Sequence, residues 1–168
     1  HALRHYFARQ QLKLRMMFEY DIQGGRTGIR TAEQEAEVLA AVKRWPQSLA
    51  LIGVELYEGV SNDEAAIRAF LRHVVARTEA LAQAGEFAEQ QVILTGAGSA
   101  WFDVVAEELT RESRYLDSDK RYQLDVILRS GCYVTHDVGA YQAALERMQT
   151  SNPVAREMNS SLQPALQV

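Results

Sequence analysis

The chain has 168 residues, 47% of them hydrophobic and 24% charged, with a formal net charge of −4. These values are ordinary for a single folded domain, and the interspersed acidic and basic residues exclude a basic nucleic-acid-binding stripe or a charged disordered tail. Apolar runs are only a few residues long, which excludes a transmembrane helix. We therefore expect a protein that contacts neither nucleic acid nor membrane.

Segments typical of strands and of helices alternate along the chain. The opening residues predict the end of a helix, and the run LKLRMMFEY then predicts a strand that breaks at Gly24-Gly25. Ser61 or Asn62 is expected to cap the longest helix, which Gly85 ends. The tail, which contains two prolines, is less regular. Helices are expected at 2–10, 32–45, 61–84, 99–109 and 138–148, and strands at 12–20, 49–56, 91–95 and 124–128.

This alternation predicts one parallel α/β sheet, because strands separated by helices cannot form tight hairpins. Four such βα units fit either a small open sheet or about half of a (β/α)8 TIM-type barrel. The pattern alone does not distinguish the two architectures.

Distinctive residues follow each of the four strands. In parallel α/β folds the carboxyl ends of the strands meet at the edge where ligands bind. Each glycine cluster has a plain interpretation as a turn, but four on one edge indicate a ligand with a phosphate, cradled by backbone N–H groups and a hydroxyl. The clusters are Gly24-Gly25-Arg26-Thr27-Gly28, Tyr57-Glu58-Gly59, Gly96-Ala97-Gly98-Ser99 and Arg129-Ser130-Gly131-Cys132-Tyr133.

The helix start at Gly98-Ser99 and the arginines Arg26 and Arg129 each have a structural and a ligand-binding interpretation. Gly98-Ser99 could be a helix N-cap instead of part of a phosphate cradle. Arg26 and Arg129 could each pair with a surface carboxylate, or could reach a ligand across the neighbouring glycines.

The remaining polar residues are weighed in the same way. Tyr57 could be a packed aromatic residue, or could offer its face to a ring and its hydroxyl to a phosphate. The neighbours His136-Asp137 are more typical of a structural pair than of a metal site, because no third ligand accompanies them. Cys132 is more typical of a small residue whose backbone matters than of a nucleophile.

Longer segments of the chain resemble fold-type III pyridoxal-phosphate enzymes. The resemblance covers nearly the whole chain and is greatest to D-serine deaminase-like (amino acid deaminase) proteins, relatives of D-threonine aldolase and, more distantly, of alanine racemase. The last of the segments resembles the one that leads into that family's C-terminal β-domain. The segments are 21–28 (DIQGGRTG), 53–59 (GVELYEG), 128–137 (LRSGCYVTHD) and 161–168 (SLQPALQV).

The resemblance implies a fold and a domain organisation. The family fold is an eight-unit barrel that carries the cofactor at its C-terminal mouth, followed by a β-domain. We expect this protein to form a homodimer. Residues 1–150 would be the later half of the barrel, roughly units five to eight, and residues 151–168 would lead towards the β-domain.

The resemblance also assigns residues to the cofactor, pyridoxal 5′-phosphate. Arg129 would face the pyridine nitrogen, where a cation disfavours protonation and restrains the cofactor as an electron sink. Arg26 would lie near the carboxylate of the substrate, and Tyr57 near the cofactor ring. The residues that would hold the phosphate are Gly98, Ser99, Gly131 and Cys132.

The lysine that holds the cofactor in this family has no counterpart in the chain. That lysine lies on the first barrel strand beside a histidine, whereas Lys13, Lys43 and Lys120 are the only lysines here and none has that context. The zinc or manganese ligands of the dehydratase and aldolase branches belong to the C-terminal domain, which is likewise without a counterpart. We therefore expect the chain to catalyse nothing alone.

The parent enzyme is expected to convert a D-serine-like amino acid into a keto acid and ammonia by α,β-elimination, with the missing lysine taking the α-proton. Retro-aldol cleavage and racemisation share this chemistry and stay open, as do a non-catalytic PLP-binding protein and an unrelated phosphate-binding barrel. We expect a cytoplasmic location, because a single cysteine excludes an internal disulfide and the opening residues do not resemble a signal peptide.

Overall fold

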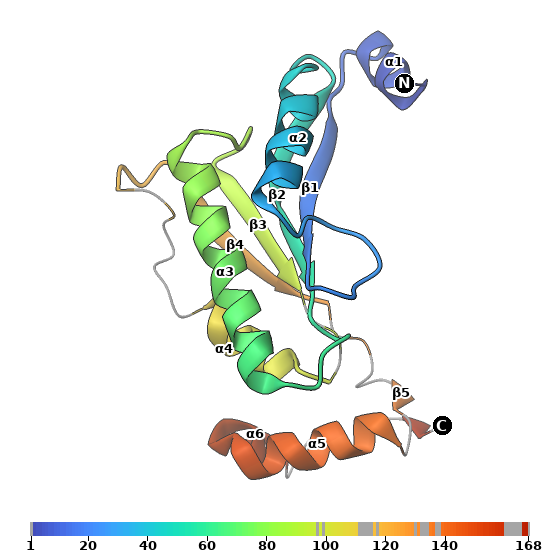
Figure 1. Ribbon diagram of the computed structural model, residues 1–168, viewed down its shortest axis with the longest axis vertical. Helices are drawn as coiled ribbons and strands as arrows, with labels where there is room; N and C mark the ends of the chain where they lie inside the picture. Colours follow the sequence, from blue (N-terminus) through green and yellow to red (C-terminus); the bar gives the residue numbers. More distant parts are fainter. Residues whose placement is uncertain are drawn as a thin grey trace.

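The structure is a computed structural model that describes residues 2–96, 98, 100–110, 116, 118–129, 131, 135–136, 139–159 and 166–167. Strands and helices alternate along the central part of the chain (Figure 1). The strands are β1 (Leu14–Asp21), β2 (Leu49–Tyr57), β3 (Gln91–Gly96), β4 (Gln123–Leu128), β5 (Thr135–His136) and β6 (Leu166–Gln167). The helices are α1 (Ala2–Arg9), α2 (Ala32–Lys43), α3 (Glu64–Gln83), α4 (Phe102–Leu109), α5 (Ala140–Ser151) and α6 (Pro153–Asn159).

The four long strands form one sheet in the order β1-β2-β3-β4, and every neighbouring pair is parallel. The prediction of a parallel α/β structure is therefore confirmed. Each strand pairs with the next one in the sequence, and α2, α3 and α4 all cover the same face of the sheet (Figure 1). The short strands β5 and β6, which the sequence did not predict, form a separate parallel pair.

The core lies between the sheet and these helices. On β1 the buried residues Phe18 and Tyr20 alternate with more exposed ones, so one face of the strand carries the apolar side chains. The long helix α3 is amphipathic, with its buried residues at helical spacing. From the helices the core receives Ile67, Leu71, Val74, Val75, Leu81, Val104, Val105 and Leu109.

One polar contact inside this layer joins β1, α2 and α3. The Tyr20 hydroxyl donates to Oε2 of Glu35 (2.5 Å), and the Arg77 guanidinium donates to both carboxylate oxygens (2.9 and 2.6 Å). Burial raises the pKa of Tyr20, and the Glu35 carboxylate raises it further, so the phenol remains a donor. Burial acts to raise the pKa of Glu35 as well, but the bonds from Arg77 and Tyr20 outweigh it and lower that pKa.

The start of α3 differs from the sequence prediction. Asp63 caps the helix, because its Oδ1 accepts hydrogen bonds from the backbone N–H groups of Ala65 (2.9 Å) and Ala66 (3.3 Å). The expectation that Ser61 or Asn62 is the cap was therefore wrong by one or two positions. The predicted stop is confirmed, since Gly85 follows the helix with a φ of +73°.

One further helix boundary was mispredicted, and one helix was not predicted at all. Helix α4 begins at Phe102, and Trp101 precedes it without a side-chain cap, so the interpretation of Gly98-Ser99 as an N-cap was wrong. The tail contains a helix that the sequence did not predict, α6, which begins at Pro153. Proline suits that first position, because the N–H it lacks would have no partner within the helix.

A bulge marks the centre of β2. Met16 pairs with Leu51 and Met17 pairs with Gly53, so β2 carries one extra residue opposite β1. On its other side Gly53 pairs with Ile93 of β3. A Cβ atom at Gly53 would overlap the Ile93 carbonyl oxygen and lie 2.9 Å from the carbonyl carbon. The two strands therefore approach closely only because residue 53 has no side chain.

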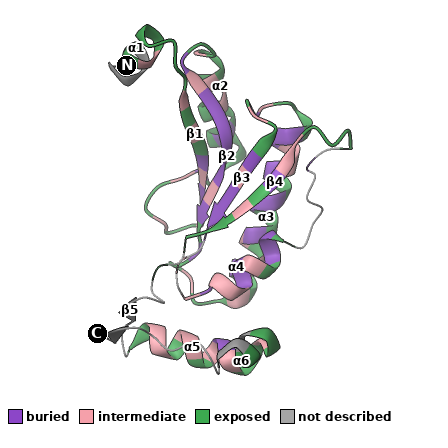
Figure 2. Cartoon of the chain, turned by 180° about the vertical axis from the view of Figure 1, so that it is seen from behind, coloured by how far each residue is buried: buried purple, intermediate pink, exposed green. Residues whose placement is uncertain are grey.

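The opposite face of the sheet is not covered by α2, α3 or α4 (Figure 2). Met17 of β1 and Ile127 of β4 are 38% and 41% exposed, although both are large and apolar. Strands β1 and β4 are the two edges of the sheet. Apart from one bridge between Tyr20 and Ile29, the described residues pair with neither outer edge. Exposed apolar residues on an uncovered face beside such edges favour association with other chains.

We expect the purified chain to self-associate through this face. Sedimentation velocity over a range of concentrations should show dimers or larger species, and the double substitution M17K/I127K should reduce them. V38K, which changes a similarly exposed residue on α2, should leave the association unchanged. A compact monomer at every concentration would contradict this expectation.

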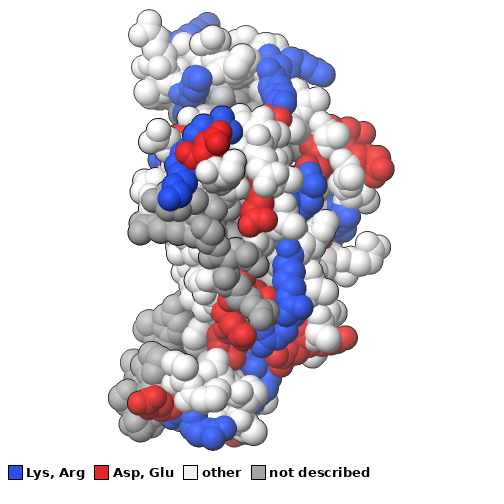
Figure 3. All heavy atoms as spheres, turned by 90° about the vertical axis from the view of Figure 1, so that its left-hand side faces the viewer, with Lys and Arg blue, Asp and Glu red and all other residues white. Residues whose placement is uncertain are grey.

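Charged side chains of both signs share the surface. On the face drawn in Figure 3, Lys and Arg lie beside Asp and Glu and do not gather in a patch of one sign. None of the helices in the described part of the chain has both the length and the apolar character that crossing a bilayer requires.

Candidate functional site

The carboxyl ends of β1 to β4 lie at one edge of the sheet, and α5 lies beyond that edge (Figure 1). The pairs Asp21–Tyr57 and Gly96–Leu128 show that the strand ends are level with one another. The loops that the sequence predicted to bind a ligand all leave the sheet from this edge. We refer to it as the C-terminal edge.

The loop after β1 is organised by Arg30 and not by Arg26. The Arg30 guanidinium donates to the backbone carbonyls of Gly25 (2.8 Å), Thr27 (2.8 Å) and Ile22 (3.2 Å). Arg26 lies on the same loop with an exposed side chain. Sequence reasoning missed Arg30, which holds the loop that carries Arg26.

Tyr57, the last residue of β2, lies against two glycines. A Cβ atom at Gly59 would be 2.5 Å from the Tyr57 hydroxyl, and one at Gly98 would be 3.0 Å from the edge of the ring. The ring thus folds back over the loop after β2 and reaches the loop after β3. The glycines at these two positions make room for the aromatic ring.

Arg129, the residue after β4, connects three strand ends. Its backbone N–H donates to the Gly96 carbonyl (3.0 Å), and its guanidinium donates to the Leu56 carbonyl (3.0 Å). The same guanidinium pairs with the Glu55 carboxylate at 3.2 Å. The side chain of Arg129 remains 45% exposed, so it can still approach a ligand.

Glu58 is a buried acidic residue at this edge to which the sequence analysis assigned no role. Its side chain is fully buried (0% exposed), and Oε1 accepts a hydrogen bond from the Gly98 backbone N–H (2.8 Å). Oε2 is buried and has no hydrogen-bond partner among the described residues. Burial raises the pKa of Glu58, although the N–H bonds and the Arg129 charge act in the opposite direction.

The other predicted ligand-binding residues are placed only in part. Gly131 is exposed, and a Cβ atom there would meet nothing within 4 Å. Ser99 and Cys132 lie outside the residues that the structure describes. Tyr57, Gly98 and Arg129 are therefore the predicted cofactor residues that the structure brings together, with Arg26 and Gly131 on loops of the same edge.

No lysine lies at the C-terminal edge. Lys13 precedes β1 and Lys120 precedes β4, so both are at the opposite end of the sheet. Lys43 ends α2 and pairs with Glu86 (2.5 Å), again at that opposite end. Among the described residues, no group of three or more His, Cys, Asp and Glu side chains is arranged to hold a metal ion.

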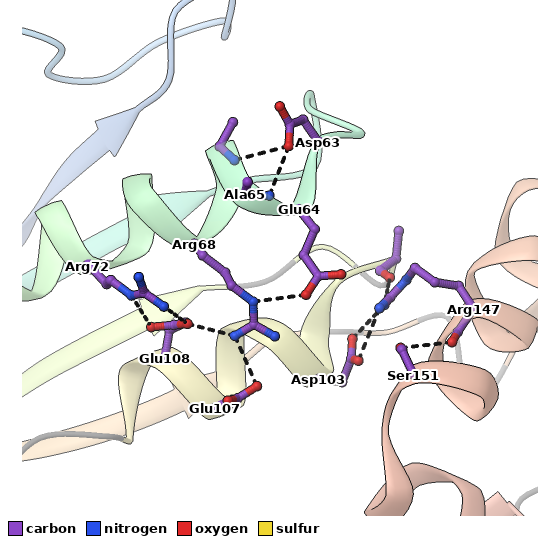
Figure 4. Close-up of polar contacts among 12 residues, drawn as sticks. Asp63, Glu64, Ala65, Arg68, Arg72, Asp103, Glu107, Glu108, Arg147 and Ser151 are labelled. Atoms are coloured by element: carbon purple, nitrogen blue, oxygen red, sulfur yellow. Dashed lines mark hydrogen bonds and ion pairs between the residues drawn. The ribbon is translucent and has the colours of Figure 1, made fainter.

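A second polar cluster lies on the helices (Figure 4). The buried Glu108 carboxylate accepts hydrogen bonds from Arg68 (2.7 Å) and Arg72 (both 2.9 Å), and Arg147 of α5 donates to Asp103 (2.7 Å). A hollow of about 650 Å³ beside the cluster is lined partly by Arg68, Asp103 and Arg147. Because each carboxylate faces an arginine, we interpret this cluster as the contact that holds α3, α4 and α5 together.

The sequence matches no protein family model and no curated protein.

Proposed function

We propose that the chain is the later half of a (β/α)8 barrel that binds pyridoxal 5′-phosphate in an enzyme acting on D-amino acids. The expected substrate is D-serine-like, and the products are a keto acid and ammonia. The observation that carries the proposal is the grouping of Tyr57, Gly98 and Arg129 at the C-terminal edge. The resemblance to fold-type III pyridoxal-phosphate enzymes assigns the same three residues to the cofactor.

The order of the strands supports the barrel. In a (β/α)8 barrel each parallel strand pairs with the next, and the helices lie on one face. In an open doubly wound sheet the order reverses and helices lie on both faces. The order β1-β2-β3-β4 with one helical face agrees with the barrel.

The residues at the edge suit a cofactor with a flat ring and a phosphate. Tyr57 presents an aromatic ring, and Arg129 supplies a cation that would disfavour protonation of a pyridine nitrogen. Gly98 has no side chain to keep a phosphate away, and Arg26 could reach a substrate carboxylate. Pyridoxal phosphate supplies an electron sink for the bond-breaking step when it is bound.

A second candidate is a non-catalytic PLP-binding protein. It is favoured by one observation, that Lys13, Lys43 and Lys120 all lie away from the C-terminal edge. The chain can therefore hold the cofactor only through non-covalent contacts. A longer chain with a lysine on a preceding barrel strand should turn over D-serine, whereas a carrier should bind the cofactor and form no product.

Binding of the cofactor to the chain tests the proposal. Titration with pyridoxal phosphate should quench the fluorescence of Trp101, which is buried three residues after Gly98, and the quenching should saturate. Pyridoxal, which lacks the phosphate, should bind at least about tenfold more weakly because the charged hydrogen bonds are lost. Absence of any saturable change would favour an unrelated barrel.

Replacing Arg129 with alanine should weaken pyridoxal phosphate binding by about tenfold. The free energy of unfolding should fall by only about 1 kcal/mol, since one hydrogen bond to a carbonyl and one half-exposed ion pair are lost. R121A, which changes an arginine before β4 at the opposite end of the sheet, should alter neither quantity. A fall in stability with unchanged cofactor affinity would assign Arg129 a structural role only.

A further inference from the structure

The contact between Glu58 and Gly98 places a carboxyl group where the proposed phosphate would bind. The inference drawn from it rests on the proposed function and concerns how the same site is regulated. The Gly98 N–H was predicted to bind a phosphate, but it donates instead to Oε1 of Glu58 (2.8 Å). The amide that was predicted to bind the ligand is therefore occupied by a carboxyl group of the chain itself.

The second oxygen of this carboxyl makes Glu58 unlike the other buried acids described above. Glu35 and Glu108 are both paired with arginines. In Glu58, Oε2 is buried and has no partner among the described residues. A buried oxygen without a hydrogen-bond partner is costly, and a group of a bound ligand is one partner that would remove this cost.

We propose that an oxyanion binds beside Gly98 only when Glu58 carries a proton, so that phosphate binding is coupled to the uptake of one proton. An ionised carboxylate would repel the oxyanion within a buried site. The neutral carboxyl has a hydrogen on Oε2, which can be donated to an oxygen of the ligand while Oε1 continues to accept from Gly98. One proton moves from solvent to Glu58, and no covalent bond changes.

The groups around Glu58 are consistent with this coupling. Arg129, from the end of β4, is the positive charge that acts on the carboxyl. From β2 itself come the Tyr57 hydroxyl and the Glu55 carboxylate, and the latter is paired with Arg129. The two acids at the start of α3 are engaged in other contacts, because Asp63 caps the helix and Glu64 pairs with Arg68. Burial raises the pKa of Glu58, which makes the neutral form accessible closer to neutral pH.

Sulfate is a suitable probe, because its charge does not change with pH in the range where a carboxyl of raised pKa titrates. Isothermal titration calorimetry of the 168-residue chain in two buffers of different ionisation enthalpy would count the protons taken up. The wild-type affinity for sulfate should fall about tenfold per pH unit above the pKa of Glu58. The substitution E58Q keeps an acceptor for the Gly98 N–H and removes the charge, so its affinity should be independent of pH, with no proton uptake.

The control is E89Q, which removes a surface carboxylate paired with Arg15. It should retain the pH dependence of the wild type. Sulfate that binds the wild type without proton uptake would overturn the coupling and leave the anion site intact. Sulfate that binds neither the wild type nor E58Q would overturn the anion site, and with it the proposed function. If E58Q fails to fold, the number of protons that the wild type takes up on binding sulfate still tests the coupling.

Discussion

Gly53→Val is expected to lower the free energy of unfolding by about 3 kcal/mol or more. A Cβ atom at this position would overlap the Ile93 carbonyl oxygen, which belongs to the backbone of the neighbouring strand. Backbone cannot rotate away as a side chain can, because Ile93 also pairs with Asp125 of β4. A branched residue would thus force β2 and β3 apart at the centre of the sheet. Urea denaturation followed by circular dichroism measures the loss.

The control for this substitution is Gly131→Ala, since a Cβ atom there would meet nothing within 4 Å. Its stability should stay within about 0.5 kcal/mol of the wild type. If Gly53→Val were equally mild, β2 and β3 could not approach each other as closely as described.

Arg77→Met is expected to cost about 3 kcal/mol near neutral pH, because it removes the arginine that pairs with a buried carboxylate. Glu35 is only 8% exposed, so its charge would remain in the core with the Tyr20 hydroxyl as its described partner. The side chain of Arg77 is 38% exposed, which places the expected cost at the lower end for buried pairs.

The cost of Arg77→Met should depend on pH. In the wild type the pKa of Glu35 lies below its ordinary value of 4.5. The pair therefore contributes stability above that value and loses it as the pH falls through the lowered pKa. In the variant, burial acts with less opposition and raises this pKa, so protonation relieves the buried charge on acidification. The stability difference should be greatest near neutral pH and smaller below pH 4.5.

Thermal unfolding at several pH values tests this dependence. R15M is the matched control, because Arg15 forms an exposed ion pair with Glu89, with side chains 57% and 40% exposed. Such pairs contribute about 0–1 kcal/mol, and little change with pH is expected. A loss from Arg77→Met that was as small as that from R15M would show that Glu35 is solvated.

The arrangement of strands could be predicted from the sequence because it depends on local patterns. The apolar run 49–56 and the amphipathic repeat of α3 each report the environment of their own residues. The cap of α3 could not be fixed as easily, since Ser61, Asn62 and Asp63 are all good caps. The backbone path into the helix selects Asp63, and that path depends on the packing of the helix against the sheet.

The sequence could predict only those residues of the candidate site that end or directly follow a strand, because a parallel sheet brings its strand ends together. Tyr57 and Arg129 directly adjoin strand ends, so a parallel sheet brings them to one edge. Glu58 has the same placement, but a charged residue after a strand is normally solvated. It is buried because the loop after β3 lies against it, a contact between residues 40 positions apart. The single indication in the sequence was an acidic residue enclosed by Tyr57 and Gly59.

The choice between Arg26 and Arg30 illustrates the same limit. Arg26 lies within the glycine loop after β1 and Arg30 follows it, and the sequence does not indicate which of them bonds the carbonyls of the loop. The loop closes with Gly24 and Gly28 at φ values of +90° and +96°, which are conformations that glycine tolerates. That closure directs the backbone carbonyls towards Arg30, and no periodicity in the sequence encodes it.

The sequential pairing of the strands also shapes how the sheet can assemble. No pairing joins β1 to β4, so the sheet can form without first bringing its most distant strands together. Each strand of the sheet pairs with the preceding strand, and one helical connection joins the two. Because these connections are similar in length, the entropic cost of closing each of them is similar. Any adjacent pair can therefore serve as a nucleus, and growth proceeds in either direction by one strand and one helix. Such a sheet can gain a unit at either edge by duplication of a gene segment without disturbing the pairings already present.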